Sequence, residues 1–314
     1  MSQLPDLSTS LGRLELPAPV LTASGCAGAG RELDNFFDIT QIGGIVTKSV
    51  MLEPRSGRAT PRMAETPSGM LNSIGLQGPG IETFIEKDLA WLRQRGARAI
   101  VSIAGNNVLE FGRLARRLRS VEGVAAIEIN ISCPNVANRG LVFACNMGTA
   151  AEVVAEVRKY AAPETPLLAK LSPDVTDIVE IARSVIDAGA NGLSMINTLL
   201  GMVIDPVTLR PKLGGRTGGL SGPAIRPVAV RAVYQVHAAL PEVPILGMGG
   251  IRTGKDALEF FAAGASAVSI GTSIFNDPSA PMRIQQEIAQ ELQARGIERL
   301  RDIIGIAHAP QESA

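Results

Sequence analysis

The fold is indicated most directly by residues 167–196, which read LLAKLSPDVTDIVEIARSVIDAGANGLSMI. Leu167–Leu171 and Gly192–Ile196 are short apolar runs, as expected of parallel strands buried on both faces. Ile178–Ala188 between them is amphipathic, and the following Gly189 can end a helix. This stretch therefore predicts one strand–helix–strand unit of a parallel sheet.

The same alternation recurs along the whole chain. The sequence predicts eight strands, at Val20–Ala23, Gly44–Lys48, Ala99–Ile103, Ala126–Ile131, Leu167–Leu171, Gly192–Ile196, Pro244–Met248 and Ala267–Ile270. Helical stretches between strands include Thr83–Arg95, followed by Gly96, Leu109–Leu118 and Ala150–Tyr160. This order favours a closed (β/α)₈ TIM barrel, and 314 residues suit a single domain over residues 1–314. An open α/β sheet is the alternative.

Composition argues against several classes of function. Lys plus Arg and Asp plus Glu both number 30, so the zero net charge favours neither nucleic acid nor an anionic membrane as partner. The chain shows no secretory signal and no apolar run of about 18 residues that could span a bilayer. Its cysteines, Cys26, Cys133 and Cys145, suit neither a disulfide framework nor a zinc site. We expect a cytoplasmic protein without a metal.

Two connections are longer than a barrel requires, Val50–Gly80 and Thr198–Leu220. Both follow strands, so the sequence predicts functional loops at the C-terminal face, where barrel active sites lie.

The fourth strand ends in Asn130-Ile131-Ser132-Cys133-Pro134-Asn135. A thiol with an ordinary pKa near 8.5 needs only modest tuning to act as a base, and flanking amides can orient a planar ligand. The alternative is a buried cysteine before a proline turn. His237 and His308 follow no predicted strand, so we interpret both as structural.

Two lysines and two glycine-containing segments complete the candidate site. Lys48 and Lys170 lie in otherwise apolar strands, where an ammonium needs an anion. A salt bridge is the structural alternative, although no carboxylate stands obviously beside either lysine, and a Schiff-base aldolase is a rival enzyme. Gly249-Gly250 and Gly271-Thr272, after the last two strands, suit a phosphate or plain turns.

Together these segments resemble the class 1 dihydroorotate dehydrogenases, in particular the NAD-linked type B catalytic subunits. The most specific matches are Asn72 to Gln77, Asn130 to Val136, Ile196 to Met202 and Thr217 to Ala224. The resemblance implies FMN-dependent oxidation of dihydroorotate to orotate in pyrimidine (UMP) biosynthesis. Cys133 would take the proton from carbon five while hydride leaves carbon six for N5 of FMN.

The resemblance also implies the other site residues. The substrate would meet Lys48, Asn72, Ser73, Ile74, Gly75, Leu76, Asn130, Asn135, Asn197 and Thr198. FMN would meet Ala23, Ser24, Lys48, Ser49, Ser102, Asn130, Lys170, Ile196, Gly222, Gly249, Gly250, Gly271 and Thr272. Departures from the type B pattern are Ser102 in place of asparagine, Arg139 and Ala144 in place of glycines, and Cys145, whose nearness to Cys133 suggests oxidative inactivation through a disulfide.

The implied assembly is a homodimer associated with an iron–sulfur/FAD electron-transfer subunit, because this chain has too few cysteines for a cluster of its own. Three alternatives stay open: a fumarate-linked type A enzyme, a related barrel that oxidises another dihydropyrimidine, and a flavin-binding subunit without turnover.

Overall fold

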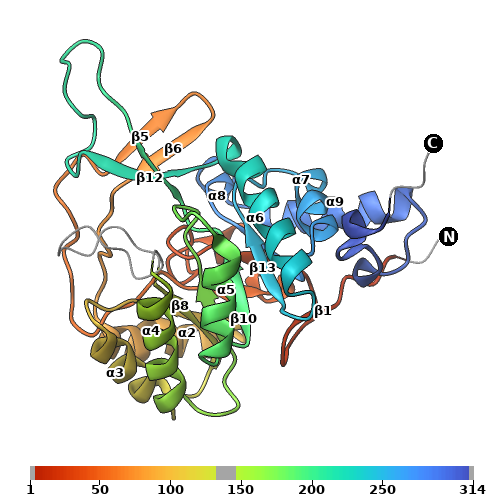
Figure 1. The fold of residues 1–314 in the computed structure, drawn as a ribbon, viewed down its shortest axis with the longest axis horizontal. Helices are drawn as coiled ribbons and strands as arrows, with labels where there is room; N and C mark the ends of the chain where they lie inside the picture. Colours follow the sequence, from red (N-terminus) through yellow and green to blue (C-terminus); the bar gives the residue numbers. More distant parts are fainter. Residues whose placement is uncertain (1–3, 132–145, 311–314) are drawn as a thin grey trace.

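The barrel is closed by eight parallel strands (Figure 1) in the order β10-β13-β14-β3-β4-β7-β8-β9. The computed structural model describes residues 4–131 and 146–310. The strands are β3 (Val20–Thr22), β4 (Gly44–Val46), β7 (Ala99–Ile103), β8 (Val124–Asn130), β9 (Leu167–Lys170), β10 (Gly192–Met195), β13 (Ile245–Met248) and β14 (Ala267–Ile270). The predicted TIM barrel is confirmed, and the open sheet is wrong.

All the predicted barrel strands are present, and their ends shift by at most two residues. The largest changes are at β4, which ends at Val46 rather than Lys48, and β8, which starts at Val124 rather than Ala126. The polar residues near the C-terminal ends of the barrel strands therefore lie at the last residue of a strand or just after it.

Helices cover the outside of the barrel (Figure 1). They are α1 (Ile81–Thr83), the π-helix η3 (Phe84–Leu89), α2 (Ala90–Arg95), α3 (Val108–Leu118), α4 (Met147–Tyr160), α5 (Ile178–Asp187), α6 (Arg226–Ala239), α7 (Gly254–Ala262), α8 (Ser273–Asn276) and α9 (Ala280–Ala294). Short 3₁₀ turns are η1 (Leu33–Asn35), η2 (Ile39–Gln41), η5 (Pro223–Ile225), η6 (Leu300–Ile303) and η7 (Ile306–His308). The predicted helical stretches are confirmed.

Helix α3 shows why these segments fold as they do. Phe111, Leu114, Ala115 and Leu118 recur at helical spacing and are all buried against the barrel. At its start, Asn107 caps the helix by accepting a hydrogen bond from the backbone N–H of Glu110 at 3.0 Å. The apolar stripe thus orients the helix.

The N-terminal mouth of the barrel is filled by a hairpin of β1 (Thr9–Leu11) and β2 (Leu14–Leu16). Leu11 and Leu16 belong to the same buried cluster as the barrel-lining Leu21, Val46 and Ile100. This end is therefore packed with apolar side chains, which leaves the opposite end for a site.

The two long connections are not simple loops. They contribute β5 (Met63–Thr66), β6 (Gly69–Asn72), β11 (Leu199–Met202) and β12 (Thr217–Ser221) to a four-stranded antiparallel sheet of order β11-β12-β6-β5. The expectation of two loops is corrected here. The strands pair across long sequence separations, as in Asn72 with Gly219, and such pairing leaves little local signal.

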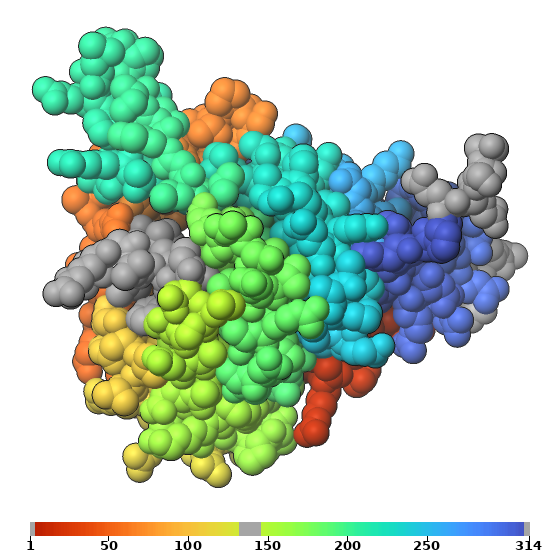
Figure 2. Space-filling view, in the orientation of Figure 1, coloured from red at the N-terminus to blue at the C-terminus, as the bar shows by residue number. Residues whose placement is uncertain are grey.

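The segment between β11 and β12 projects from the body of the protein (Figure 2). It carries strongly exposed apolar side chains, including Val207 (89%) and Leu209 (75%). Within residues 4–131 and 146–310, no helix has the length and apolar character that crossing a membrane requires.

Candidate functional site

A cavity of about 300 Å³ lies at the C-terminal ends of the barrel strands, beside the antiparallel sheet. Most of the predicted site residues line it together: Ala23, Ser24, Lys48, Ser49, Asn72, Ile74, Gly75, Leu76, Asn130, Lys170, Ile196, Asn197, Thr198, Gly222, Gly249, Gly250, Gly271 and Thr272. Residues far apart in the sequence, from Ala23 to Thr272, therefore line the same cavity.

Two predicted contacts do not line this cavity. Ser73 and Ser102 are fully buried; Ser73 accepts a hydrogen bond from Arg58 at 3.3 Å, and Ser102 lies among the strands of the barrel. Cys133 and Asn135 lie outside the described residues, as do Arg139, Ala144 and Cys145.

The structure also adds lining residues that the sequence did not single out. Met63 and Met70 come from the β5–β6 hairpin, Ser221 from β12, and Phe275 from α8. Met63, Met70 and Ser221 belong to the antiparallel sheet, whose strands pair over long sequence separations and therefore leave little local signal in the sequence.

A chain of hydrogen bonds runs from the cavity wall into the barrel. Asn130 Nδ2 donates to Ser49 Oγ at 2.8 Å, and Ser49 Oγ lies 2.8 Å from Ser102 Oγ. Ser102 Oγ donates in turn to Glu128 Oε1 at 3.0 Å. Because the Ser102 proton is committed to the carboxylate, Ser49 must donate to Ser102.

This direction fixes the amide of Asn130. With Nδ2 turned to Ser49, the amide oxygen Oδ1 accepts from Asn197 Nδ2 at 3.4 Å. Asn197 Oδ1 accepts from the backbone N–H of Thr198 at 2.8 Å. The two asparagines are thus held with defined donor and acceptor directions, as recognition of a planar polar ring requires.

Lys170 and Lys48 differ in their surroundings. Lys170 is only 3% exposed, and its Nζ lies 3.5 Å from Glu128 Oε2 and donates to Ser24 Oγ at 3.3 Å. The sequence offered no obvious carboxylate for this lysine, but the fold supplies Glu128. Lys48 is half-buried and forms no ion pair with any residue in the described ranges.

The electrostatics of Lys48 suit an anionic ligand. Burial lowers its pKa below the ordinary value of 10.5, and the positive charge of Arg62 lowers that pKa further. A ligand carboxylate in the cavity would relieve both effects by supplying the missing counter-charge.

The segment after β6 holds an unusual backbone. Gly75 has φ +78° and Leu76 has φ +56°, a left-handed conformation that costs a non-glycine residue about 1 kcal/mol. Beside them, Asn72 Nδ2 donates to the carbonyl of Gly219 in β12 at 3.3 Å. This pairing ties the segment to the antiparallel sheet and directs it to the cavity.

The glycine pair after β13 gives close access to backbone N–H groups. A Cβ at Gly249 would lie 2.8 Å from Ala229 Cβ, and one at Gly250 would lie 2.8 Å from the carbonyl of Gly222. Both positions also have positive φ, +131° and +80°. Only glycine fits there, and a phosphate could approach this backbone closely.

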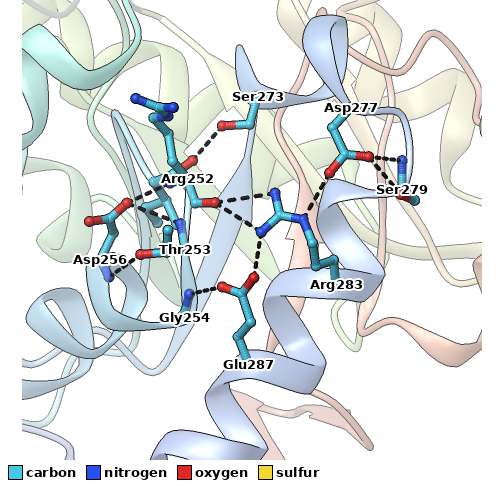
Figure 3. Close-up of polar contacts among 10 residues, drawn as sticks. Arg252, Thr253, Gly254, Asp256, Ser273, Asp277, Ser279, Arg283 and Glu287 are labelled. Carbon is cyan, nitrogen blue, oxygen red and sulfur yellow. Dashed lines mark hydrogen bonds and ion pairs between the residues drawn. The ribbon is translucent and has the colours of Figure 1, made fainter.

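The loops after β13 and β14 are braced from outside by Arg283 of α9 (Figure 3). Arg283 donates to Asp277 at 2.8 Å, to Glu287 at 2.6 Å and to the carbonyl of Arg252 at 3.3 Å. Ser273 Oγ, after β14, donates to the carbonyl of Ile251, after β13, at 2.7 Å. The two loops are therefore held together as one wall of the cavity.

Comparison with known proteins shows the family. A family model described as dihydroorotate dehydrogenase matches residues 6–292. The chain belongs to this family.

Its relatives within the dihydroorotate dehydrogenase family include three named dihydroorotate dehydrogenase B (NAD(+)), catalytic subunit. That of Desulforamulus reducens is 50% identical over 96% of this chain and 99% of its own length. That of Geobacter sp. (strain M21) is 49% identical over 96% and 98% of the two chains. That of Geobacillus sp. (strain WCH70) is 47% identical over 95% of each.

Cys26 and the two histidines are the other titratable side chains considered from the sequence. None of them is suited to act as an acid or base in the cavity of this dihydroorotate dehydrogenase family member. Cys26 lines the cavity, but burial raises its pKa to about 11, even though Lys170 and Lys48 oppose that rise. His237 packs against His308 with ring centroids 5.0 Å apart, and neither lines the cavity. In the described ranges no group of His, Cys, Asp or Glu could hold a metal.

Proposed function

We propose that this chain is the NAD-linked, type B enzyme that oxidises dihydroorotate to orotate in pyrimidine biosynthesis. One observation carries the proposal: Lys48, three asparagine amides and Lys170 line one cavity in a member of the dihydroorotate dehydrogenase family. The names of the relatives favour this type over the fumarate-linked type A enzyme and over other dihydropyrimidine substrates.

The residues around Lys48 would bind the substrate. Lys48, which lacks an ion-pair partner among the described residues, would meet the carboxylate, and Asn72, Asn130 and Asn197 would hold the N–H and C=O groups of the ring. The fixed amide directions of Asn130 and Asn197 support this role, since the positions of their donor and acceptor atoms are then defined before the ligand binds. Thr198 and the backbone of Ile74 to Leu76 would complete the contacts.

The other half of the cavity would hold FMN. The close-approach glycines Gly249 and Gly250, with Gly271 and Thr272, would receive the phosphate, and Ser24, Ser49, Ile196 and Lys170 would hold the ring and ribityl chain. The chemistry that bound FMN supplies is acceptance of a hydride from the substrate. A single unit over residues 1–314 would carry both halves.

Cys133 would take the proton from carbon five of dihydroorotate. It follows Asn130, which lines the cavity, by three residues in the sequence. The other candidate thiol, Cys26, has a pKa raised to about 11, which makes it too weak an acid to serve as a base near neutrality.

A Schiff-base aldolase is the rival reading for the two lysines. It is disfavoured for Lys170, because that ammonium is paired with Glu128 and buried, whereas an amine nucleophile must be uncharged. Borohydride trapping of a carbonyl substrate on Lys48 or Lys170 would revive this reading.

Electrons would leave through a partner. The relatives are named catalytic subunits, which implies a further subunit, and we propose an iron–sulfur/FAD subunit that passes electrons to NAD, associated with a homodimer of this chain. The exposed Val207 and Leu209 on the projecting segment support such association. Light scattering on the purified chain, alone and with that subunit, tests both assemblies.

An anaerobic absorbance titration of the purified chain with dihydroorotate tests the function. A yellow protein whose flavin band bleaches is expected. A yellow protein that does not bleach would argue for another substrate or for a flavin-binding subunit without turnover. A colourless protein that cannot be reconstituted with FMN would overturn the proposal.

A further inference from the structure

A carboxylate is buried inside the barrel where an apolar side chain would be expected. Glu128, in β8, has no exposed surface and does not line the cavity. Its two oxygens are fully engaged: Oε1 accepts from Ser102 at 3.0 Å, and Oε2 accepts from Ser194 at 2.6 Å and lies 3.5 Å from Lys170 Nζ. A buried carboxylate is costly unless it is paired in this way.

The arrangement spans four neighbouring strands. Ser102 of β7 is the register partner of Glu128 in β8, and Lys170 of β9 is the register partner of Ser194 in β10. The two serines therefore hold the carboxylate from both sides, and Lys170 supplies the only positive side chain within ion-pair distance among the described residues. The barrel fixes the position of the carboxylate through its own hydrogen-bonded strands.

Lys170 connects this buried charge to the cavity. Its Nζ lies between Glu128 Oε2 at 3.5 Å and Ser24 Oγ at 3.3 Å, and both Lys170 and Ser24 line the cavity. Glu128 therefore lies behind the residues that line the cavity. Its charge acts on a ligand in the cavity mainly by holding and partly neutralising Lys170. A positive charge beside a flavin stabilises its reduced, anionic form, so a counter-ion behind that charge weakens the effect.

We propose that Glu128 is a positioning residue that holds Lys170 in place and limits the positive potential that Lys170 applies to the flavin. The proposal rests on the FMN site of the proposed function. It gives a role to a buried carboxylate that does not itself line the cavity.

The test uses the flavin-loaded chain with sulfite, which adds to N5 of oxidised flavins to give an anionic adduct that positive charge favours. Glu128→Gln keeps the size of the side chain but removes its charge. We expect sulfite binding to tighten about tenfold. The flavin midpoint potential should rise by about 30 mV, because a tenfold change in an equilibrium constant corresponds to that shift for a two-electron couple. Glu128→Asp, which keeps the charge but withdraws it from Lys170, should change both in the same direction by less, and serves if the glutamine variant does not fold.

Two controls separate charge from structure. Ser194→Ala removes one hydrogen bond from the same carboxylate without changing charge, and sulfite binding should stay close to that of the parent. In a Lys170→Met background, Glu128→Gln should alter sulfite binding by clearly less than in the parent, because the part of the effect that depends on the position of the lysine is lost.

Unchanged or weaker sulfite binding in Glu128→Gln would overturn the inference, as would equal changes in Ser194→Ala or a full effect without Lys170. If the parent binds FMN and is bleached by dihydroorotate, these outcomes leave the proposed function intact. A parent that cannot be loaded with FMN would overturn both.

Discussion

The hydroxyl oxygens of Ser49 and Ser102 lie 2.8 Å apart, in a buried contact between the segment just after β4 and strand β7. Ser49 lines the cavity and Ser102 does not, so this contact joins the ligand-facing layer to the layer behind it. Through it, the carboxylate of Glu128 sets the direction of the Asn130 amide.

Ser49→Ala should therefore weaken orotate binding more than the loss of one small hydroxyl group would suggest. The Asn130 Nδ2 group loses its acceptor, and loss of one buried hydrogen bond costs about 1–3 kcal/mol. We expect roughly a tenfold increase in the orotate dissociation constant, measured from the change in flavin absorbance. Ser184→Ala is the control, since Ser184 Oγ donates to the carbonyl of Ile181 at 2.8 Å and does not line the cavity. Equal losses in both variants would contradict the proposed link to Asn130.

Binding of orotate should weaken as the pH rises through the pKa of Lys48. Burial lowers this pKa below 10.5, and Arg62 adds to the effect, so the ammonium that meets the carboxylate is lost at a lower pH than for an ordinary lysine. Bound orotate raises the same pKa, and the affinity falls on the alkaline side of the free-enzyme value.

Lys48→Arg provides the control for this pH dependence, because a guanidinium stays charged over the range. Its alkaline loss of orotate affinity should disappear. Lys48→Met should bind orotate about 10- to 100-fold more weakly than the parent below the pKa of Lys48, and this difference should shrink at higher pH as the parent loses its own charge. An unchanged alkaline limb in Lys48→Arg would assign the titration to another group.

Cys133→Ala should keep FMN and lose turnover by roughly 10²–10⁴-fold, the usual range for removal of a general base. Stopped-flow reduction of the flavin by dihydroorotate measures this step directly. Cys26→Ala should retain most of the turnover, because the pKa of Cys26 is about 11 and its thiol stays protonated. The assignment of the base fails if the two variants lose similar activity.

Arg283→Met should weaken FMN binding although Arg283 lies outside the cavity. The side chain braces the carbonyl of Arg252 and the carboxylates of Asp277 and Glu287, which hold the loops after β13 and β14. We expect about a tenfold rise in the FMN dissociation constant, followed by fluorescence of released flavin. Arg295→Met, which removes exposed contacts with the side chain and the carbonyl of Glu291 at the C-terminal end of the same helix, should bind FMN like the parent.

Stability should fall in mild acid because of His237. Burial lowers the pKa of this imidazole from 6.5, and His308 adds to the effect. As the pH drops below 6.5, the unfolded chain takes up the proton first, so this contribution is complete above 6.5 and is lost as the pH falls through the lower folded value. Melting temperatures between pH 7.5 and 5.5 should fall less in His237→Gln; parallel curves would show that another group is responsible.

The sequence by itself determined the barrel and the main members of the site. Apolar runs such as Leu167–Leu171 alternate with amphipathic helices, and this alternation is a local property that can be read along the chain. Lys48, Asn130, Lys170 and Asn197 stand at or just after strand ends, and closure of a parallel barrel brings such ends together.

The tertiary structure decided which side chains line the cavity and which lie behind them. Asn72 meets Gly219 across 147 residues, and Lys170 finds Glu128 on the neighbouring strand, so neither contact follows from local periodicity. Ser102 was predicted to touch FMN, but it lies in the layer behind the cavity wall and bonds Ser49 and Glu128. Pairing register and barrel closure set the depth of each inward side chain, and both arise from contacts between strands far apart in the sequence.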